Sequence, residues 1–250
     1  MSVSLKLISL NIERHKHLDL VEKFLAQRMP DVVCLQEVFE HDLERLARAF
    51  GATSTAFEPM GRLPEELPPG VMGVAILSRV PIRKMRAHYY AGIPGVLNDA
   101  IIGNKLTFQQ LNKLVLTVEL EKEGKPFRIA TTHFTWTPDG APDEFQRAHI
   151  LKLLTVLEGL GEFVFCGDLN APRGGEIFDM LSAKYKDNIP PHYETSLDIS
   201  LHRAGKSRPH ELENKMVDGL FSTPAYLASG VELVPGVSDH MAIVADITLL

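Results

Sequence analysis

The chain has 250 residues and a formal net charge of −6, and 45% of its residues are hydrophobic and 23% charged. This composition is that of a globular protein, and the length suits one domain covering residues 1–250. The negative charge argues against a broad basic surface for nonspecific duplex binding, and no apolar run is long enough to span a bilayer, so we expect no stable membrane insertion.

The N-terminal segment and the two cysteines indicate a cytoplasmic protein. The segment MSVSLKLISLNIERHK has no basic start, no long apolar centre and no small-residue cleavage site, so we expect no signal peptide. Cys34 and Cys166 each lie in an apolar run, which favours reduced core residues over a disulfide or a metal site.

Strand-like and helix-like segments alternate in the first part of the chain, and strands predominate later. Apolar residues at helical spacing predict helices, and short apolar or β-branched runs predict strands. The expected strands are residues 3–11, 32–36, 73–77, 114–120, 127–132, 164–170, 216–221, 231–234 and 243–249. The expected helices are residues 18–29, 39–50, 142–157 and 176–181. Residues 58–70 and 86–105 are rich in Pro and Gly, and we expect irregular loops there, of the kind that often form substrate walls.

The strand VFCGDLN, residues 164–170, ends in an acid and an amide two positions apart. Alternation along an extended chain places Asp168 and Asn170 on one face, so both side chains point into the same space. A strand-end turn is the simpler explanation of this pair taken alone, because Asn, Asp and Gly are common in turns and Pro172 follows.

Other strand-like runs also lead to polar residues. These residues are Asn11 after LISL, Glu37 after VVCLQ, His133 after RIATT, Asp218 within KMVDGLF, and Asp239 and His240 within VPGVSDHMAI. Each has a structural explanation of its own, such as a turn, a helix N-terminus or a strand edge. Together they indicate a shared site, because unpartnered polar groups are costly to bury. Carboxylate and amide oxygens without thiolates favour a hard cation, Mg²⁺ or Mn²⁺, over zinc.

On these residues the chain resembles the endonuclease/exonuclease/phosphatase superfamily, which includes abasic-site endonucleases, pancreatic-type deoxyribonucleases, sphingomyelinases, inositol-polyphosphate phosphatases and tyrosyl-DNA phosphodiesterases. The motifs occur in order as SLNIE, LQEV, GVAILSR, TTHFT, GDLNAP, MVDGLF and SDHMAI, and they cover nearly the whole chain. The resemblance implies an α/β fold, a four-layer α/β sandwich of two mixed β-sheets packed face to face with helices outside, and a site at one edge.

The resemblance also implies metal ligands. Glu37 is expected to be the principal ligand of Mg²⁺, with Mn²⁺ as an alternative. Asn11 would lie beside it as a ligand or as a partner of a ligand. Asp239 would bind the metal directly or through water.

The remaining residues are implied to act on the substrate. Asp168 would orient and deprotonate the attacking water, and Asn170 would hold that water or a phosphate oxygen. Asp218 would fix the tautomer of His240, whose imidazole faces the phosphate. His133 would contact a non-bridging oxygen or help to protonate the leaving group.

The sequence departs from the pattern of known members in places that bear on the substrate. Abasic-site endonucleases usually carry Tyr at the position of His133 and Trp at that of Leu10. Pancreatic-type enzymes have a carboxylate near the position of Met72, and the usual Arg/Lys-Ile-Asp-Tyr signature is replaced here by MVDG around Asp218. These differences leave the catalytic set intact and leave the substrate open.

Two further residues are candidates for substrate binding. Trp136, just past His133, is placed to stack on a substrate, although the one Trp of a chain is often structural. Arg147 is expected on the following helix, where it either holds a phosphate or lies on a solvated helix face.

We therefore expect a Mg²⁺-dependent phosphoester hydrolase, in the first place a phosphodiesterase that uses water activated by Asp168. Its partner would be a phosphoester substrate, either a nucleic acid or a small-molecule or lipid phosphodiester. A DNA- or RNA-acting nuclease or repair enzyme is the alternative within this chemistry. A noncatalytic binding module on the same fold is a third interpretation, which the complete set of site residues disfavours.

Overall fold

The computed structural model describes residues 3–250, and its centre is a pair of six-stranded β-sheets. The first sheet has the strand order β11-β12-β1-β2-β4-β3. Its strands are β1 (Ser4–Asn11), β2 (Val32–Phe39), β3 (Ser54–Leu63), β4 (Gly70–Ser78), β11 (Tyr226–Val234) and β12 (Ala242–Leu249). β1 and β2 are parallel and the other neighbours antiparallel, so the sheet is mixed.

The second sheet is also mixed and has the strand order β5-β6-β7-β8-β10-β9. Its strands are β5 (Ile82–Ala91), β6 (Lys113–Lys122), β7 (Lys125–His133), β8 (Val164–Asp168), β9 (Lys186–Asp187) and β10 (Asp218–Ser222). β7 and β8 are parallel, and the other neighbours are antiparallel.

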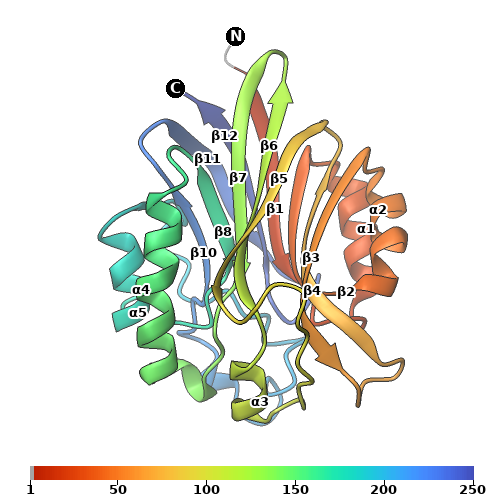
Figure 1. Cartoon of the computed structure of the whole chain (residues 1–250), viewed down its shortest axis with the longest axis vertical. Helices are drawn as coiled ribbons and strands as arrows, with labels where there is room; N and C mark the ends of the chain where they lie inside the picture. The colour runs from red at the N-terminus through yellow and green to blue at the C-terminus, as the bar shows by residue number, and fades with distance from the viewer. Residues whose placement is uncertain (1–2) are drawn as a thin grey trace.

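Helices cover the outer faces of the two sheets, as Figure 1 shows. The α-helices are α1 (Leu18–Arg28), α2 (Leu43–Phe50), α3 (Lys105–Gln109), α4 (Glu144–Glu158) and α5 (Glu176–Ser182), and short 3₁₀ turns occupy Glu40–Asp42, Pro138–Gly140 and Pro209–Glu211. α1 and α2 pack on the first sheet, and α4 and α5 pack on the second. The four-layer α/β sandwich expected from the sequence is confirmed.

The apolar core lies in three layers that follow from the alternation of side chains along the strands. One cluster fills the space between the sheets and includes both cysteines, which are free and buried as expected. Two further large clusters lie between each sheet and its own helices, and two smaller ones lie around Phe108 and around Leu212. A strand such as β8 is therefore apolar on both faces, and its polar residues can appear only at its end.

The parallel pairs set the position of the site. β1 and β2 run in the same direction, with Asn11 opposite Gln36, and β7 and β8 run in the same direction, with His133 opposite Asp168. The carboxyl ends of these strands lie at the edge of the sandwich away from the two chain termini (Figure 1).

Three expectations about local structure are corrected. Residues 58–70 and 86–105 were expected to be irregular, yet β3 extends to Leu63 and β5 to Ala91. The helix expected at 39–50 begins later, because Phe39 still belongs to β2 and a 3₁₀ turn precedes α2.

In the part of the chain from residue 3 onward, no helix is long and apolar enough to cross a membrane.

Candidate active site

A cleft of about 870 Å³ opens at the edge of the sandwich where the strand ends meet. Seven of the ten residues singled out in the sequence line it. They are Glu37, His133, Trp136, Asp168, Asn170, Asp239 and His240. Asn11 and Asp218 lie directly behind this lining and contact it through hydrogen bonds.

Asp168 is at the centre of the cleft because of the strand register. It is the last residue of β8, it pairs with His133 on β7, and it pairs on the other side with Asp218 on β10. Its side chain is 2% exposed. Burial raises the pKa of Asp168, and the nearby charge of His240 opposes this effect.

Three polar groups approach one oxygen of this carboxylate. The Asn11 amide donates a hydrogen bond to Asp168 Oδ2 at 2.9 Å. Nε2 of His133 lies 3.5 Å from the same oxygen, and Nε2 of His240 lies 3.9 Å from it. Asn11 comes from the first sheet and His133 from the second, so Asp168 Oδ2 is a point where the two sheets meet.

Glu37 reaches the cleft through an irregularity in β2. The pairing of β2 with β4 shifts register between Leu35 and Val38, and Glu37 has a φ of 55°. A residue in the left-handed region is uncommon unless it is Gly, Asn or Asp, and such bulges often redirect a side chain at a functional site. The bulge directs the carboxylate of Glu37 into the cleft, while Gln36 is buried against Thr131.

The charges around Glu37 keep it ionised. Burial alone would raise its pKa, yet the charge of Arg14, helped by the hydrogen bond from Asn11, lowers the pKa of Glu37 to about 2. Nη1 of Arg14 forms an ion pair with Glu37 Oε2. The other oxygen, Oε1, lies 3.4 Å from the Asn11 amide nitrogen and 3.8 Å from His133 Nε2.

Asn170 follows Asp168 in a tight turn with a φ of 49°. Its backbone N–H donates to Asp168 Oδ1 at 2.8 Å, and its side-chain amide donates to the carbonyl of Phe134 at 3.2 Å. Gln146 on α4 donates to the Asn170 carbonyl at 3.1 Å. Asn170 is therefore both part of a strand-end turn and a residue of the cleft lining, because the turn places it at the cleft.

His240 is held by Asp218. Nδ1 of His240 lies 2.7 Å from Asp218 Oδ2, so Nδ1 carries the proton and Nε2 faces the cleft. Burial disfavours the charged imidazole, but the carboxylates of Asp218 and Asp168 raise the pKa of His240 well above its usual value. His240 is therefore a cation at neutral pH.

His133 has the opposite electrostatic character. Burial lowers its pKa, and the charge of Lys113 adds to this effect while Asp168 opposes it. Its Nδ1 is buried and has no hydrogen-bond partner among the described residues. The site thus pairs a neutral imidazole with a protonated one on two sides of Asp168.

Among the charged residues missed in the sequence, Glu13 and Arg14 line the cleft, and Lys113 is buried close to Asp168 and Glu37. Glu13 and Arg14 lie in the turn after β1, where both have positive φ, and Lys113 begins β6 and is 1% exposed. Burial lowers the pKa of Lys113 to about 8, although Asp168 and Glu37 oppose the shift. Glu13 and Arg14 lie two and three positions after Asn11, and this proximity was an available signal. Nothing in the apolar run of β6 marks Lys113.

The donor set fits a divalent cation. Asp239 is 7% exposed, its one hydrogen bond comes from Ser238 at 3.2 Å, and no cation within residues 3–250 forms an ion pair with it. Burial raises the pKa of Asp239 to about 7; the charge of His240 opposes this effect, and the carboxylates of Glu13 and Glu37 add to it. Glu37, Asp239 and the Asn11 amide offer the hard oxygens that Mg²⁺ prefers. Arg14 forms an ion pair with Glu37 and would share this carboxylate with a bound cation.

The two candidate substrate-binding residues are placed differently. Trp136 lines the cleft and packs edge-on against Phe108, with ring centroids 6.0 Å apart. Arg147 lies on α4, outside the lining, and forms an exposed bidentate ion pair with Glu176, with Nε 2.8 Å from Oε1.

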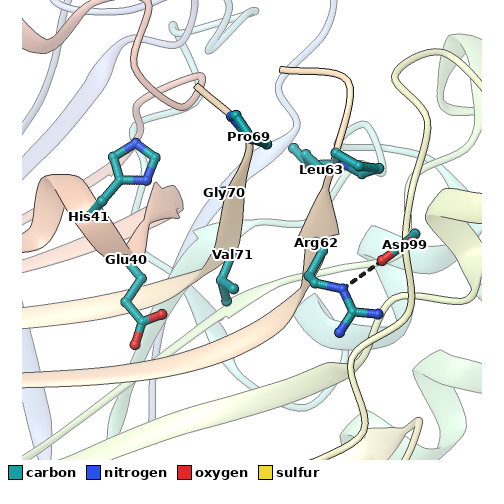
Figure 2. A pocket seen from close by; sticks show the side chains of 9 residues that line it. Glu40, His41, Arg62, Leu63, Pro69, Gly70, Val71 and Asp99 are labelled. Atoms are coloured by element: carbon teal, nitrogen blue, oxygen red, sulfur yellow. Dashed lines mark hydrogen bonds and ion pairs between the residues drawn. The ribbon is translucent and has the colours of Figure 1, made fainter. Parts of the chain in front are cut away.

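A second hollow of about 460 Å³ lies near the β3–β4 connection (Figure 2). Glu40, His41 and the ion pair between Arg62 and Asp99 line it. None of the residues singled out in the sequence lines this hollow, whereas seven of them line the larger cleft.

Comparisons with solved structures agree with this fold. An endonuclease/exonuclease/phosphatase protein from Bacteroides vulgatus superimposes with a TM-score of 0.72 at 17% identity and covers 99% of this chain and 100% of its own. The human Nocturnin catalytic domain gives 0.69 at 18% identity over 100% and 97% of the two chains. A mannosyl-6-phosphatase from Bacteroides thetaiotaomicron gives 0.67 at 12% identity over 98% and 99%. At these identities the likeness shows the fold alone.

No curated protein matches the sequence. The family model does match, from residue 8 to residue 240, and this span runs from β1 to the His240 that faces the cleft. The chain belongs to the Endonuclease/Exonuclease/phosphatase family.

Proposed function

We propose that this protein is a phosphodiesterase that hydrolyses phosphoesters with the help of a divalent cation. The observation that carries the proposal is the convergence on Asp168 Oδ2 of Asn11, His133 and His240, three polar groups from separate segments of the chain. A structural role alone does not require this arrangement, because burial of so many ionisable groups costs stability.

Asp168 is the base of the proposed reaction. Its raised pKa brings the carboxylate closer to the basicity that proton abstraction from water requires. The hydrogen bonds from Asn11 and from the Asn170 backbone hold both oxygens in place. A water beside Asp168 would thus be oriented before it attacks phosphorus.

His240 supplies positive charge to the same space. It is protonated and held by Asp218, so its Nε2–H can donate to a phosphate oxygen or to the leaving group. His133 is neutral and can donate a hydrogen bond to a non-bridging oxygen. Asn170, which lines the cleft, would hold the water or a phosphate oxygen.

Glu37 and Asp239 would hold the cation, with Asn11 beside them. A bound Mg²⁺ or Mn²⁺ supplies Lewis-acid stabilisation of the charge that develops on phosphate oxygens. We assign Mg²⁺ as the first choice because the donors are oxygens.

The test is hydrolysis of a substrate panel with Mg²⁺, with Mn²⁺ and with EDTA. The panel contains single-stranded DNA, abasic DNA, 5′-tyrosyl DNA, RNA, sphingomyelin, inositol phosphates and a hexose 6-phosphate, the last because one structural neighbour is a mannosyl-6-phosphatase. We expect metal-dependent turnover of at least one diester and its loss in Asp168→Asn. Absence of metal-dependent turnover on every substrate, together with Mg²⁺ binding by calorimetry, would instead support a noncatalytic binding module.

A nucleic-acid diester is the second candidate, and the cleft wall favours it. Trp136 offers an aromatic face, and the basic residues Arg203, Arg208 and Lys215 line the same cleft although the whole protein is acidic. Proteins commonly bind single-stranded nucleic acids by stacking the bases on aromatic side chains while nearby basic side chains contact the phosphate backbone. Trp136→Ala should then raise KM for single-stranded DNA or RNA and leave KM for a small diester unchanged.

A further inference from the structure

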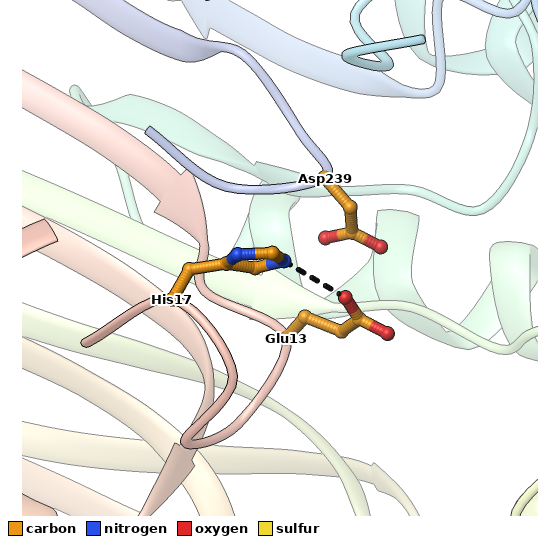
Figure 3. Close-up of side chains that lie close together, drawn as sticks. All are labelled: Glu13, His17 and Asp239. Atoms are coloured by element: carbon orange, nitrogen blue, oxygen red, sulfur yellow. Dashed lines mark hydrogen bonds and ion pairs between the residues drawn. The ribbon is translucent and has the colours of Figure 1, made fainter. Parts of the chain in front are cut away.

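A group of three side chains beside the proposed Mg²⁺ ligands has no assigned role. It consists of Glu13 in the turn after β1, His17 just before α1, and Asp239 in the loop before β12 (Figure 3). One ligand atom from each lies within 4.8 Å of the other two. His17 Nε2 is 3.1 Å from Glu13 Oε2.

Asp239 is the unsatisfied member of the group. Its Oδ1 accepts one hydrogen bond, from Ser238, and its Oδ2 has no donor among residues 3–250. The residue is nonetheless only 7% exposed, and its side chain points toward His17 and Glu13 in Figure 3. A mostly buried carboxylate with a single hydrogen bond is costly, and a bound cation would reduce that cost.

Glu13 already contacts two basic side chains, Lys16 and Arg14. Its Oε1 contacts the ammonium group of Lys16, and Nη2 of Arg14 lies 3.5 Å from it. Its Oε2 faces His17. The side chain of Lys16 is 41% exposed, so it can move into solvent when another cation arrives, whereas Glu13 and Asp239 are fixed by burial.

We propose that Glu13, His17 and Asp239 form a second cation site, which takes a divalent transition-metal ion such as Zn²⁺ or Mn²⁺. One imidazole nitrogen with two carboxylate oxygens is a set of three protein ligands that such ions accept, with a further position open to water or substrate. Mg²⁺ is disfavoured, because it prefers oxygen ligands alone.

The site is separate from the proposed Mg²⁺ position on Glu37. The guanidinium group of Arg14 contacts carboxylates of both residues and so lies between Glu13 and Glu37. Asp239 belongs to both ligand sets and would join them. Because Glu13 and Asp239 line the cleft, a cation here would offer a second positive charge to an anionic substrate.

Direct binding tests the site without any assay of turnover. Metal-free protein is dialysed against Zn²⁺ in an excess of Mg²⁺, and the retained Zn²⁺ is counted per chain. We expect one Zn²⁺ in the wild type, and at least tenfold weaker binding in His17→Gln and in Glu13→Gln. Glu37→Gln and His240→Gln should keep the Zn²⁺, and His41→Gln, which removes a histidine from the second hollow, is the matched control.

Failure to retain Zn²⁺ in the wild type, or full retention by His17→Gln, overturns the proposal. Loss of Zn²⁺ in Glu37→Gln or in His240→Gln also overturns it, because the ion would then occupy one of those positions. Circular dichroism checks that each variant folds. If His17→Gln does not fold, the X-ray absorption spectrum of the Zn²⁺-loaded wild type decides, since one imidazole at about 2.0–2.1 Å is expected and its absence refutes the site.

Discussion

Nδ1 of His240 lies 2.7 Å from Oδ2 of Asp218, and this contact joins a loop of the first sheet to a strand of the second. Asp218 begins β10, and its backbone N–H donates to the hydroxyl of Ser196 at 3.1 Å, which holds the backbone at this strand end. The carboxylate of Asp218 in turn orients the imidazole of His240.

This contact predicts that Asp218 and His240 act as one unit. His240→Ala should lower kcat by about 10²–10⁴-fold, the usual contribution of a positioned acid or base, with a smaller change in KM. Asp218→Ala should cost less, and the double variant should be little worse than His240→Ala alone. The measurement is a double-mutant cycle on kcat. If the two losses multiply, another group orients His240, and Asp218 serves only the turn beside Gly219.

A second prediction concerns Arg14, which forms ion pairs with Glu37, Glu66 and Glu13 inside the protein. Arg14→Met removes the cation from Glu37 and Glu66, while Glu13 keeps Lys16, and it should lower the free energy of unfolding by roughly 3–5 kcal/mol in EDTA. It also frees Glu37 Oε2, so Mg²⁺ should bind more tightly and restore more stability than in the wild type.

Denaturant unfolding with and without Mg²⁺, together with calorimetry, checks this prediction. Arg45→Met is the matched control, because Arg45 also bridges two carboxylates, Asp19 and Glu22, but does so on the exposed surface of two helices. Weaker Mg²⁺ binding in Arg14→Met would mean that Arg14 supports the metal position and does not compete for it.

A third prediction follows from Asp239. Its pKa in the folded protein is raised by burial to about 7, so the metal-free protein holds a proton there that must leave when a cation binds. The apparent Mg²⁺ affinity should therefore rise from pH 6 to pH 8, most steeply below pH 7. Calorimetry in several buffers should show proton release on binding at pH 6. Asp239→Asn should bind more weakly and with a flatter dependence on pH.

The same group fixes the sign of a stability change. A carboxyl with a raised folded-state pKa contributes stability below its unfolded pKa, and that contribution is lost as pH rises through about 7. Metal-free Asp239→Asn should therefore melt at a higher temperature than the wild type at pH 8, and the difference should shrink toward pH 5. An equal or lower melting temperature at pH 8 contradicts the raised pKa.

A fourth prediction concerns the buried Lys113, whose ammonium group donates to the Phe134 carbonyl at 3.3 Å. Burial lowers its pKa to about 8, below the unfolded value of about 10.4, so the unfolded state binds more protons between these values. Stability of the wild type relative to Lys113→Met should rise by ~2–3 kcal/mol from pH 8 to pH 10. Parallel denaturation curves measure it. Lys84→Met, at an exposed position, should show no such trend.

Much of the candidate site was accessible from sequence because it follows from strand physics. Apolar runs such as VFC cannot carry polar groups until they leave the core, so Asp168 and His133 marked the strand ends by themselves. What joins the ends in space is the pairing of the strands. A single sequence does not show which strands pair or in which register. The family motifs indicated which strand ends come together.

The residues that were missed lack such a pattern. Arg14 and Glu13 lie in a turn with positive φ, a conformation that no local propensity predicts for these residue types. β3 was hidden by Pro59 and Gly61 at a register shift, and β5 by exposed polar residues along an edge strand. Tertiary pairing outweighs propensity at both strands.

The distribution of the site residues over the two sheets has a consequence for how the protein folds. The residues proposed to hold the cation, Glu37, Asn11 and Asp239, come from the first sheet and from the loop before β12, whereas Asp168 and His133 come from the second sheet. A transition state in which the first sheet has formed should already be stabilised by Mg²⁺, and added Mg²⁺ should then speed refolding. If the first sheet forms only after the transition state, added Mg²⁺ should slow unfolding and leave the refolding rate unchanged.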